Sequence, residues 1–184
     1  MQIYTIHNFH KTYSQKIIDI KTLFFIIGHM EKIRIFLDAS AISNLEQADM
    51  PKEMADMRAL WEKIQQGEFE VIVSEPVIEE LDRIQDLTKK DKIFKYLDTI
   101  DYSSVKITDE MVSIAQMVVL NCILTDKNFT DCLHIGCSIA TDCDCLVSYN
   151  YKHLKRLSAI RGTQAISIQL GHKILNIVSA DSLI

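Results

Sequence analysis

Short apolar segments alternate with helical segments along this chain, and this alternation constrains the fold more than any other feature of the sequence. Residues 32–37 and 69–73 are rich in Ile, Val and Phe, and the segment 145–147 is also apolar. We predict a strand at each of these three places. Helical segments between successive strands favour right-handed crossovers and a parallel sheet. The predicted fold class is therefore α/β, a three-layer α/β/α arrangement around a central, mainly parallel sheet.

Helix signals fill the intervals between these strands. The clearest is an amphipathic pattern that starts at Pro51 and ends at Gly67. Ser74, Thr108 and Thr130 are predicted at helix starts, because serine and threonine side chains accept hydrogen bonds from the exposed N–H groups there. We also expect helices at residues 41–47, 88–99 and 110–121, a helix opened by Lys152 and His153, a short strand or linker at 104–107, and an edge strand at 174–178.

The length of the chain predicts one main domain, which we place at residues 30–184. Residues 1–29 form an N-terminal extension that the sequence does not explain, and Met30 is an alternative translation start. The apolar run from Leu23 to Ile27 is too short to cross a bilayer, and no signal-peptide cleavage site follows it. We therefore expect a cytoplasmic protein that makes no membrane contact.

The five cysteines are odd in number and clustered in the second half of the chain. Zinc binding with His134 is one interpretation, but the sequence has no C-x-x-C pair. We expect reduced thiols that pack as small hydrophobic groups. The net charge of −5 excludes a general affinity for nucleic acid, although it leaves room for a local basic groove.

Three acidic residues fall at comparable positions in the predicted elements. Asp38 follows the first strand, Glu80 lies on the helix after the second strand, and Asp131 lies in the first turn of the helix before the third. In a parallel sheet all three can meet at one edge. Clustered carboxylates repel one another unless a hard cation such as Mg²⁺ or Mn²⁺ neutralises them.

Each acid also has an ordinary structural explanation. Asp38 can cap a helix, Glu80 follows Glu79 and such pairs usually face solvent, and Asp131 suits the positive end of a helix dipole. Spacing alone therefore leaves both interpretations open.

Four segments, taken together, resemble the PIN domain family, and in particular its VapC-like bacterial ribonuclease branch. They are IFLDASAISNL (35–45), VSEPVIEEL (73–81), DCLHIGCS (131–138) and LVSYNYKHL (146–154). The ending GHKILNIVSADSLI (171–184) is also similar to that of one branch, with Ser179 or Ala180 where the family has a proline. The resemblance covers residues 33–184.

This resemblance implies a metal-dependent endoribonuclease that hydrolyses phosphodiester bonds of single-stranded or structured RNA. Asp38, Glu80 and Asp131 match the family's acids for Mg²⁺ or Mn²⁺, and Asn150 stands at its fourth acidic position, where it orients a water or a phosphate instead of binding metal as an anion. The residues expected at the substrate are Ser40, Ser148, Asn150, Lys152 and His153. The resemblance also implies a toxin of a toxin–antitoxin pair, an antitoxin protein as partner, and a homodimer.

The replaced fourth acid supports an alternative, a catalytically weak or inactive PIN module that binds RNA or a protein partner. A third class, a nucleotide-binding or hydrolase protein, is disfavoured because the sequence has neither a glycine-rich phosphate loop nor a G-x-S-x-G motif. Trp61 and the methionines near it offer either a dimer surface or core. Candidates for an RNA track, most of which we interpret as ordinary surface charge, are Lys89, Lys90, Lys92, Lys95, Lys155, Arg156 and Arg161.

Overall fold

The computed structural model describes residues 31–121 and 123–184. Residues 32–184 form one compact unit. The predicted N-terminal extension, residues 1–29, and its boundary at residue 30 lie outside the described residues, so the domain division stays a prediction.

A parallel sheet of five strands lies at the centre of this unit, in the order β3-β2-β1-β4-β5. Each neighbouring pair is parallel, with Ile35 of β1 opposite Val71 of β2 on one side and opposite Cys145 of β4 on the other. The predicted α/β class is therefore confirmed, and the described sheet is parallel throughout. The strands are β1 (Ile33–Leu37), β2 (Phe69–Ser74), β3 (Ser103–Val105), β4 (Cys145–Val147) and β5 (Asn176–Val178).

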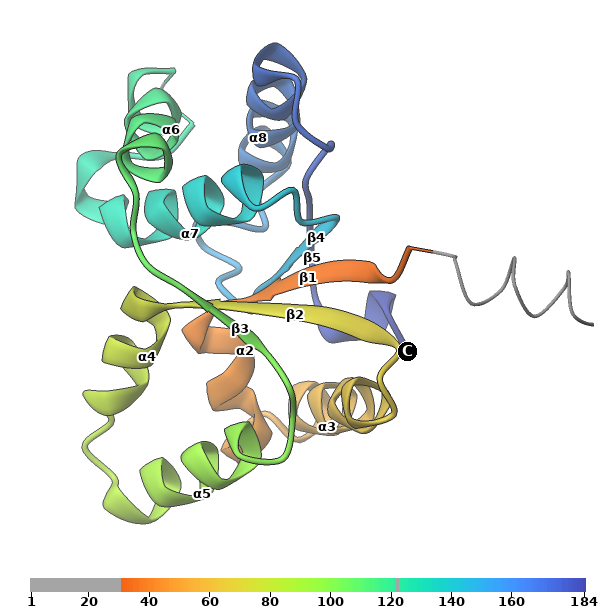
Figure 1. The fold of residues 1–184 in the computed structure, drawn as a ribbon. Coiled ribbons are helices and arrows are strands. Elements are labelled where there is room, and N and C mark those ends of the chain that lie inside the picture. The colour runs from red at the N-terminus through yellow and green to blue at the C-terminus, as the bar shows by residue number, and fades with distance from the viewer. Residues whose placement is uncertain (1–30, 122) are drawn as a thin grey trace, which may run out of the picture. The chain divides into compact units, whose positions relative to one another are not determined.

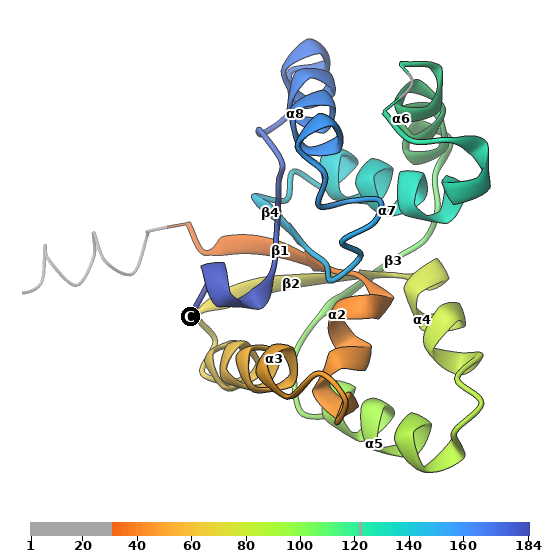
Figure 2. The same cartoon turned by 180° about the vertical axis from the view of Figure 1, so that it is seen from behind.

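Helices cover both faces of the sheet and make the three layers (Figures 1 and 2). This arrangement follows from the chain order, because the helices lie in the crossover connections between parallel strands, and such connections must run over a face of the sheet. One face carries α2 (Ala39–Ser43), α3 (Pro51–Gln65), α4 (Glu75–Asp82) and α5 (Leu87–Leu97); the other carries α6 (Asp109–Leu120), α7 (Phe129–Ala140) and α8 (Leu157–Leu170). Three short 3₁₀ turns are η1 (Asn44–Glu46), η2 (Asp126–Asn128) and η3 (Ala180–Ser182).

Two predicted helix starts are wrong. Helix α7 begins at Phe129 after Asn128, so Thr130 lies inside the helix and does not cap it. Helix α8 begins at Leu157, and Lys152 and His153 lie in the turn before it. The turn persists because the Asn150 side chain accepts a hydrogen bond from the His153 N–H at 3.3 Å, which offers this backbone a partner outside a helix.

The other predicted starts hold. Thr108 accepts a hydrogen bond from the N–H of Met111 at 3.3 Å and caps α6. Ser74 stands at the N-cap position of α4, although its side chain makes no capping bond. The positive φ of Gly67 lets the chain reverse after α3 and enter β2.

The core includes the residues that the sequence offered as a dimer surface. Trp61 is 2% exposed and Met57 is fully buried, so this part of α3 packs inside the domain. The indole N–H of Trp61 donates to the Thr99 hydroxyl at 3.1 Å, which satisfies its polar atom. Of the two alternatives that the sequence left open, core is therefore the correct one for Trp61 and Met57.

Cys137, Cys143 and Cys145 are free and buried, as predicted, and Cys132 is also buried. Burial raises the thiol pKa of Cys137 and Cys145 to about 11 and that of Cys143 to about 12. Such thiols stay protonated at neutral pH and behave as apolar groups. Cys122 lies outside the described residues. Within those residues, no helix has both the length and the apolar character needed to cross a membrane.

Close packing of α6 on α7 depends on one glycine. A Cβ atom added at Gly136 would lie 2.3 Å from the backbone oxygen of Met111. Only glycine permits this approach, and the contact fixes the position of α7 and therefore of Asp131 at its start.

Candidate functional site

Polar residues gather where β1, β2 and β4 reach their carboxyl ends. Asp38 follows β1, Ser148 follows β4, and α4, which carries Glu80, begins directly after β2. Because these strands are parallel neighbours, their ends share one edge of the sheet (Figure 2). The site is built around this edge.

Asp38 is a helix cap and a member of the buried site at once. Its Oδ1 accepts hydrogen bonds from the Ala41 N–H and from the Ser40 hydroxyl, both at 2.7 Å. The residue is only 2% exposed, and burial raises its pKa above the ordinary value although these hydrogen bonds act in the opposite direction. The ordinary explanation, a cap, is therefore correct but incomplete.

Two serines join the ends of β1 and β4. The Ser40 hydroxyl accepts a hydrogen bond from the N–H of Tyr149 at 2.8 Å and lies 3.4 Å from the Ser148 hydroxyl. Ser148 is fully buried, and its hydroxyl accepts a bond from the N–H of Asn150 at 3.0 Å. The two strand ends are thus held at a fixed separation.

Asp131 meets the turn after β4. The side-chain amide of Asn150 donates to both carboxylate oxygens, at 3.0 and 3.1 Å, and Nδ1 of His153 lies 3.6 Å from Oδ2. Burial raises the pKa of Asp131, while His134, Asn150 and His153 lower it. The three predicted residues Asp131, Asn150 and His153 therefore contact one another.

The acid group of Glu80 is also perturbed by burial. Burial raises its pKa to about 7, and the negative charges of Asp38 and Asp131 add to that effect, whereas Arg83 opposes it. Its neighbour Glu79 faces outward and pairs with Arg83 at 3.3 Å. Sequence reasoning did not single out Arg83, which no motif marks.

His134 lies behind this acid. The imidazole is 2% exposed, and its Nε2 is 3.6 Å from Oε1 of Glu80. Burial lowers its pKa to about 4, so the ring is neutral at pH 7. Neither ring nitrogen has a hydrogen-bond partner within the described part of the chain. A neutral, buried imidazole therefore packs against the carboxylate of Glu80, with its ring centroid 5.9 Å from that of Phe36.

The donor set suits a hard divalent cation. Asp38, Glu80 and Asp131 supply carboxylate oxygens, and burial raises the pKa of each, so their charged forms are disfavoured at this edge. A cation would relieve that cost. In residues 31–121 and 123–184, however, no three His, Cys, Asp or Glu side chains are already gathered closely enough to hold one ion. The carboxylates are neighbours without forming a ready ligand set.

The predicted lysines have fewer contacts that tie them to the site. Lys152 is exposed in the turn after β4, next to Asn150 and His153 in sequence. The lysines of α5 are engaged in local contacts, which supports the interpretation as ordinary surface charge. Lys89 bonds Gln47, and the ion pairs are Lys90–Asp82 at 2.7 Å, Lys92–Glu46 at 2.9 Å and Lys95–Asp91 at 2.6 Å.

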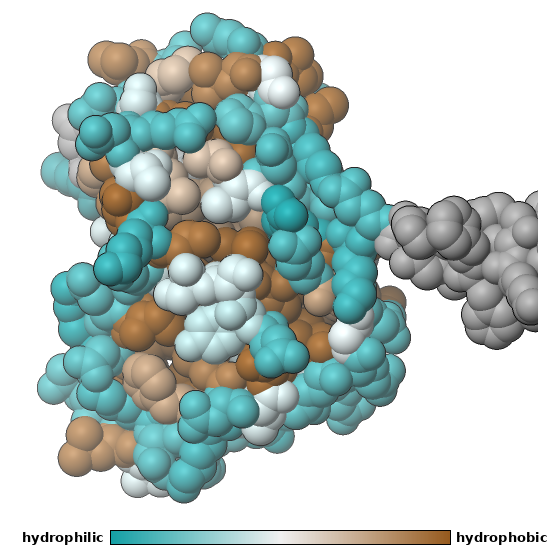
Figure 3. Space-filling view, in the orientation of Figure 1, coloured by the Kyte–Doolittle hydropathy of each residue, from teal (hydrophilic) through white to brown (hydrophobic). Residues whose placement is uncertain are grey.

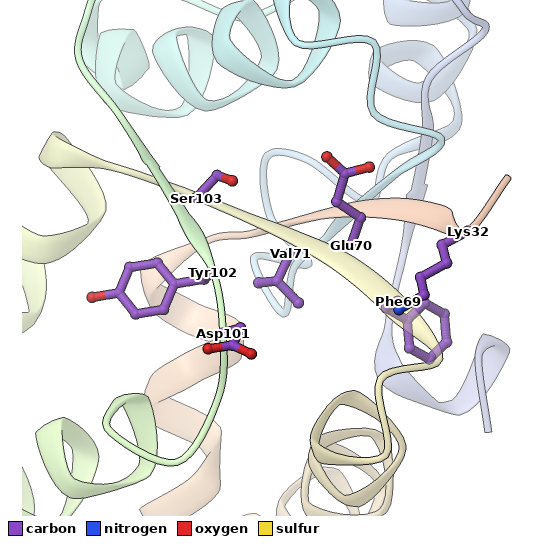
Figure 4. Close-up of a pocket in the computed structure, with 7 residues that line it drawn as sticks. All are labelled: Lys32, Phe69, Glu70, Val71, Asp101, Tyr102 and Ser103. Carbon is purple, nitrogen blue, oxygen red and sulfur yellow. The ribbon is translucent and has the colours of Figure 1, made fainter.

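A hollow lies elsewhere, at the amino ends of β1, β2 and β3. It encloses about 410 Å³, and its lining includes Phe69, Glu70 and Tyr102 (Figure 4). On that face, residues of intermediate hydropathy lie over β3, hydrophobic residues show beside them, and hydrophilic residues surround both (Figure 3). Glu70 pairs with Arg34 at 3.0 Å, and none of the predicted site residues lines the hollow. Its chemistry does not point to a reaction.

Comparison with known proteins agrees with the geometry. A model of a protein family described as PIN domain matches residues 34–152, a span that contains Asp38, Glu80, Asp131 and Asn150. No curated protein matches the chain. Among solved structures, the chain is similar to the crystal structure of VapBC2 from Rickettsia felis bound to a DNA fragment from their promoter, with a TM-score of 0.51 and 12% identity over 78% of this chain and 98% of that chain. At this identity the likeness concerns the fold.

Proposed function

Because this chain belongs to the PIN domain family, whose members are generally nucleases, we propose that it is a metal-dependent endoribonuclease acting on single-stranded RNA. The observation that carries the proposal is the placement of three buried or half-buried carboxylates at one sheet edge, where two of them act on the charge of the third. Burial and the charges of Asp38 and Asp131 raise the pKa of Glu80 to about 7, which is the electrostatic signature expected of acids arranged around a cation.

Asp38, Glu80 and Asp131 are the residues that would hold Mg²⁺ or Mn²⁺. Such an ion, when bound, supplies the positive charge that polarises a phosphate and lowers the pKa of a water. Asn150 keeps both oxygens of Asp131 oriented through its amide. Ser40 fixes the Asp38 carboxylate by donating to it at 2.7 Å.

The substrate side of the site is the turn after β4. Ser148, Asn150, Lys152 and His153 follow one another there, and we assign them to the phosphate that is cut. Attack of water on phosphorus breaks the bond to the 3′ oxygen, so the products are a 5′-phosphate and a 3′-hydroxyl. The exposed ammonium of Lys152 suits an RNA phosphate, because such contacts are electrostatic and independent of base sequence.

We also propose that the protein is a toxin with an antitoxin partner. The similar structure from Rickettsia felis contains VapBC2 with a promoter DNA fragment, and the shared fold motivates the same type of assembly here. A homodimer and a cytoplasmic site of action belong to the same proposal. Growth arrest on expression, relieved by co-expression of a neighbouring gene, is the expected result; unimpaired growth at full expression would contradict the toxin assignment.

One observation favours a second function, an RNA- or protein-binding module with weak or no catalysis. Asn150 occupies the fourth acidic position and donates its amide to Asp131, so it fills space near the acids without adding a negative charge. In that case a divalent cation would bind weakly and RNA would be held uncut.

Cleavage of a fluorescent single-stranded RNA in Mg²⁺, Mn²⁺ or EDTA separates the two. We expect metal-dependent cleavage by the wild type that is lost in Asp38→Asn and Asp131→Asn. Glu80→Gln should also lose activity, whereas Glu79→Gln, which removes an exposed carboxylate of the same helix, should retain it. A folded wild type that binds RNA but does not cut it in either metal would establish the binding module instead.

A further inference from the structure

An exposed aromatic ring stands beside the site without an assigned role. Tyr151 is 48% exposed and follows Asn150, the residue that bonds Asp131. Its backbone N–H donates to the carbonyl of Tyr149 at 2.9 Å, and the N–H of Leu154 donates to the carbonyl of Asn150 at 3.0 Å. These bonds make the turn tight, so the position of Tyr151 relative to the acids is fixed.

The ring itself is held by two neighbours from the same segment between β4 and α8. Tyr149 lies with its ring centroid 6.2 Å away at an interplanar angle of 68°, and the ammonium of Lys155 is 5.0 Å from the Tyr151 centroid. Lys155 is in turn anchored, because it donates to the Ser179 hydroxyl at 2.6 Å. The ring is therefore oriented in advance, although nearly half of the residue faces solvent. A side chain whose orientation is already restricted loses little entropy when it binds a ligand.

The charges around Tyr151 restrict what can lie on it. Burial raises the pKa of its hydroxyl, and the carboxylates of Glu53, Asp181 and Asp56 add to that effect. These carboxylates disfavour a phosphate beside the ring, although the Lys155 ammonium lies 5.0 Å from the ring centroid, and they do not repel a neutral planar base. The exposed Lys152, the next residue in the turn, offers a cation for a phosphate.

We propose that Tyr151 is a substrate-binding residue that stacks on a nucleobase of the RNA, adjacent to the nucleotide whose phosphate is cut. The inference rests on the proposed function for its substrate class and adds a base-contacting residue to it. Stacking on an aromatic ring accepts any base, so Tyr151 would contribute affinity and register without strong sequence preference.

The test uses the full chain with Asp38→Asn, so that RNA stays intact in Mg²⁺, and single-stranded RNAs that carry one fluorescent 2-aminopurine at successive positions. Stacking on Tyr151 should quench the probe at one or two adjacent positions. Tyr151→Leu, which keeps apolar bulk but removes the ring, should abolish the quenching and weaken RNA binding about 5- to 100-fold. Tyr151→Phe should keep both within about twofold, because stacking does not need the hydroxyl.

The matched control is Tyr102→Leu, since Tyr102 is another exposed tyrosine, 37% accessible, at the start of edge strand β3. It should leave affinity and quenching unchanged. Quenching that survives Tyr151→Leu, or a wild-type ring that quenches no position, overturns the proposal. An equal loss in Tyr102→Leu also overturns it, because the effect would then not belong to this site.

The same measurements distinguish failure of the proposed nuclease function from failure of the stacking proposal. If the chain without Asp38→Asn cuts no RNA in Mg²⁺ or Mn²⁺ but quenching still depends on Tyr151, the stacking residue stands and the catalytic proposal falls. If the chain cuts RNA with unchanged KM and kcat in Tyr151→Leu, the nuclease stands and the stacking proposal falls. Thermal melting of each variant confirms that the exposed substitution leaves the fold intact.

Discussion

Two glutamates of this protein, Glu46 and Glu80, illustrate opposite uses of the same side chain. Glu46 accepts charged partners from two helices, Arg58 of α3 at 2.8 Å and Lys92 of α5 at 2.9 Å. Lys92 and Arg58 lower the pKa of Glu46, whereas burial and the charges of Asp38 and Asp131 raise that of Glu80 to about 7.

The difference lies in what neutralises each charge. Glu46 is matched by cations that the chain itself supplies, so it joins η1 to its neighbours and needs nothing else. Glu80 is placed among other acids, where its charge costs free energy until an external cation is present. A carboxylate cluster that lowers the stability of the fold is typical of a binding site. A carboxylate paired with cations of the same chain is typical of a structural contact.

The largest expected effect is on catalysis. Glu80→Gln should reduce RNA cleavage in Mg²⁺ about 100-fold, equal to about 2.7 kcal/mol of transition-state stabilisation, because one oxygen ligand is weakened. Glu46→Gln should leave cleavage within about twofold. Initial rates at saturating Mg²⁺ measure both. Equal losses in the two variants would show that the contrast between a site and a structural contact is mistaken.

The second prediction concerns the packing of α6 on α7, which supports Asp131, and does not involve the contacts of Glu46. Gly136→Ala places a Cβ against the Met111 carbonyl, so the free energy of unfolding should fall by about 1–3 kcal/mol. Urea unfolding with tryptophan fluorescence measures this change. Ser113→Ala, on the exposed face of α6, is the control and should change stability by less than about 0.5 kcal/mol. An unaffected Gly136→Ala would mean that α6 and α7 adjust freely.

Local patterns were sufficient to predict the layers and most elements. The β-branched runs in β1 and β2, the proline that opens α3 and the glycine that ends it each act within a few residues. The parallel sheet then followed from chain connectivity. An error arose where a local side-chain bond competes with the helix: Lys152 and His153 look like a helix start, but the turn bonded through Asn150 delays α8 to Leu157.

The role of the site residues stays a prediction, but their meeting at one edge could be foreseen. Strand ends and the family resemblance both pointed to Asp38, Glu80 and Asp131, and the fold brings Asp38 and Asp131 within electrostatic reach of Glu80. The sequence does not distinguish Glu79 from Glu80 by chemistry; burial does, since their side chains are 65% and 34% exposed. Nor could it reveal that Tyr149 and Lys155 orient Tyr151, because the ring geometry depends on the turn.

The third prediction concerns pH and has a definite sign. The folded-state pKa of Glu80 is raised from 4.5 to about 7, so the folded state keeps a proton that the unfolded state loses. Stability contributed by this group is therefore present below about pH 4.5 and lost as pH rises through 7. In EDTA, Glu80→Gln should gain about 1–2 kcal/mol over the wild type between pH 5 and pH 8, a value reduced for partial exposure.

Urea unfolding of both proteins at the two pH values measures that difference. Adding Mg²⁺ should stabilise the wild type more than Glu80→Gln and so reduce or reverse the gain, because the cation neutralises the carboxylate that costs free energy. A gain that is absent in EDTA would show that Glu80 ionises without cost, which would remove the electrostatic reason for a cation at this edge.

The smallest expected change in the free energy of unfolding, with the opposite pH dependence, is that of Glu46→Gln. The folded pKa of Glu46 is lowered by Lys92 and Arg58, so its contribution is present above the unfolded pKa of about 4.5 and is lost as pH falls through the folded value. Glu46→Gln should therefore lower the free energy of unfolding by less than about 1 kcal/mol at pH 7, and by progressively less toward pH 3. Salt at about 1 M should reduce the effect further, since the partners are partly exposed. A Glu46→Gln variant that gains stability as pH rises, like Glu80→Gln, would mean that both carboxylates are unmatched and that the ion pairs do not hold the charge of Glu46.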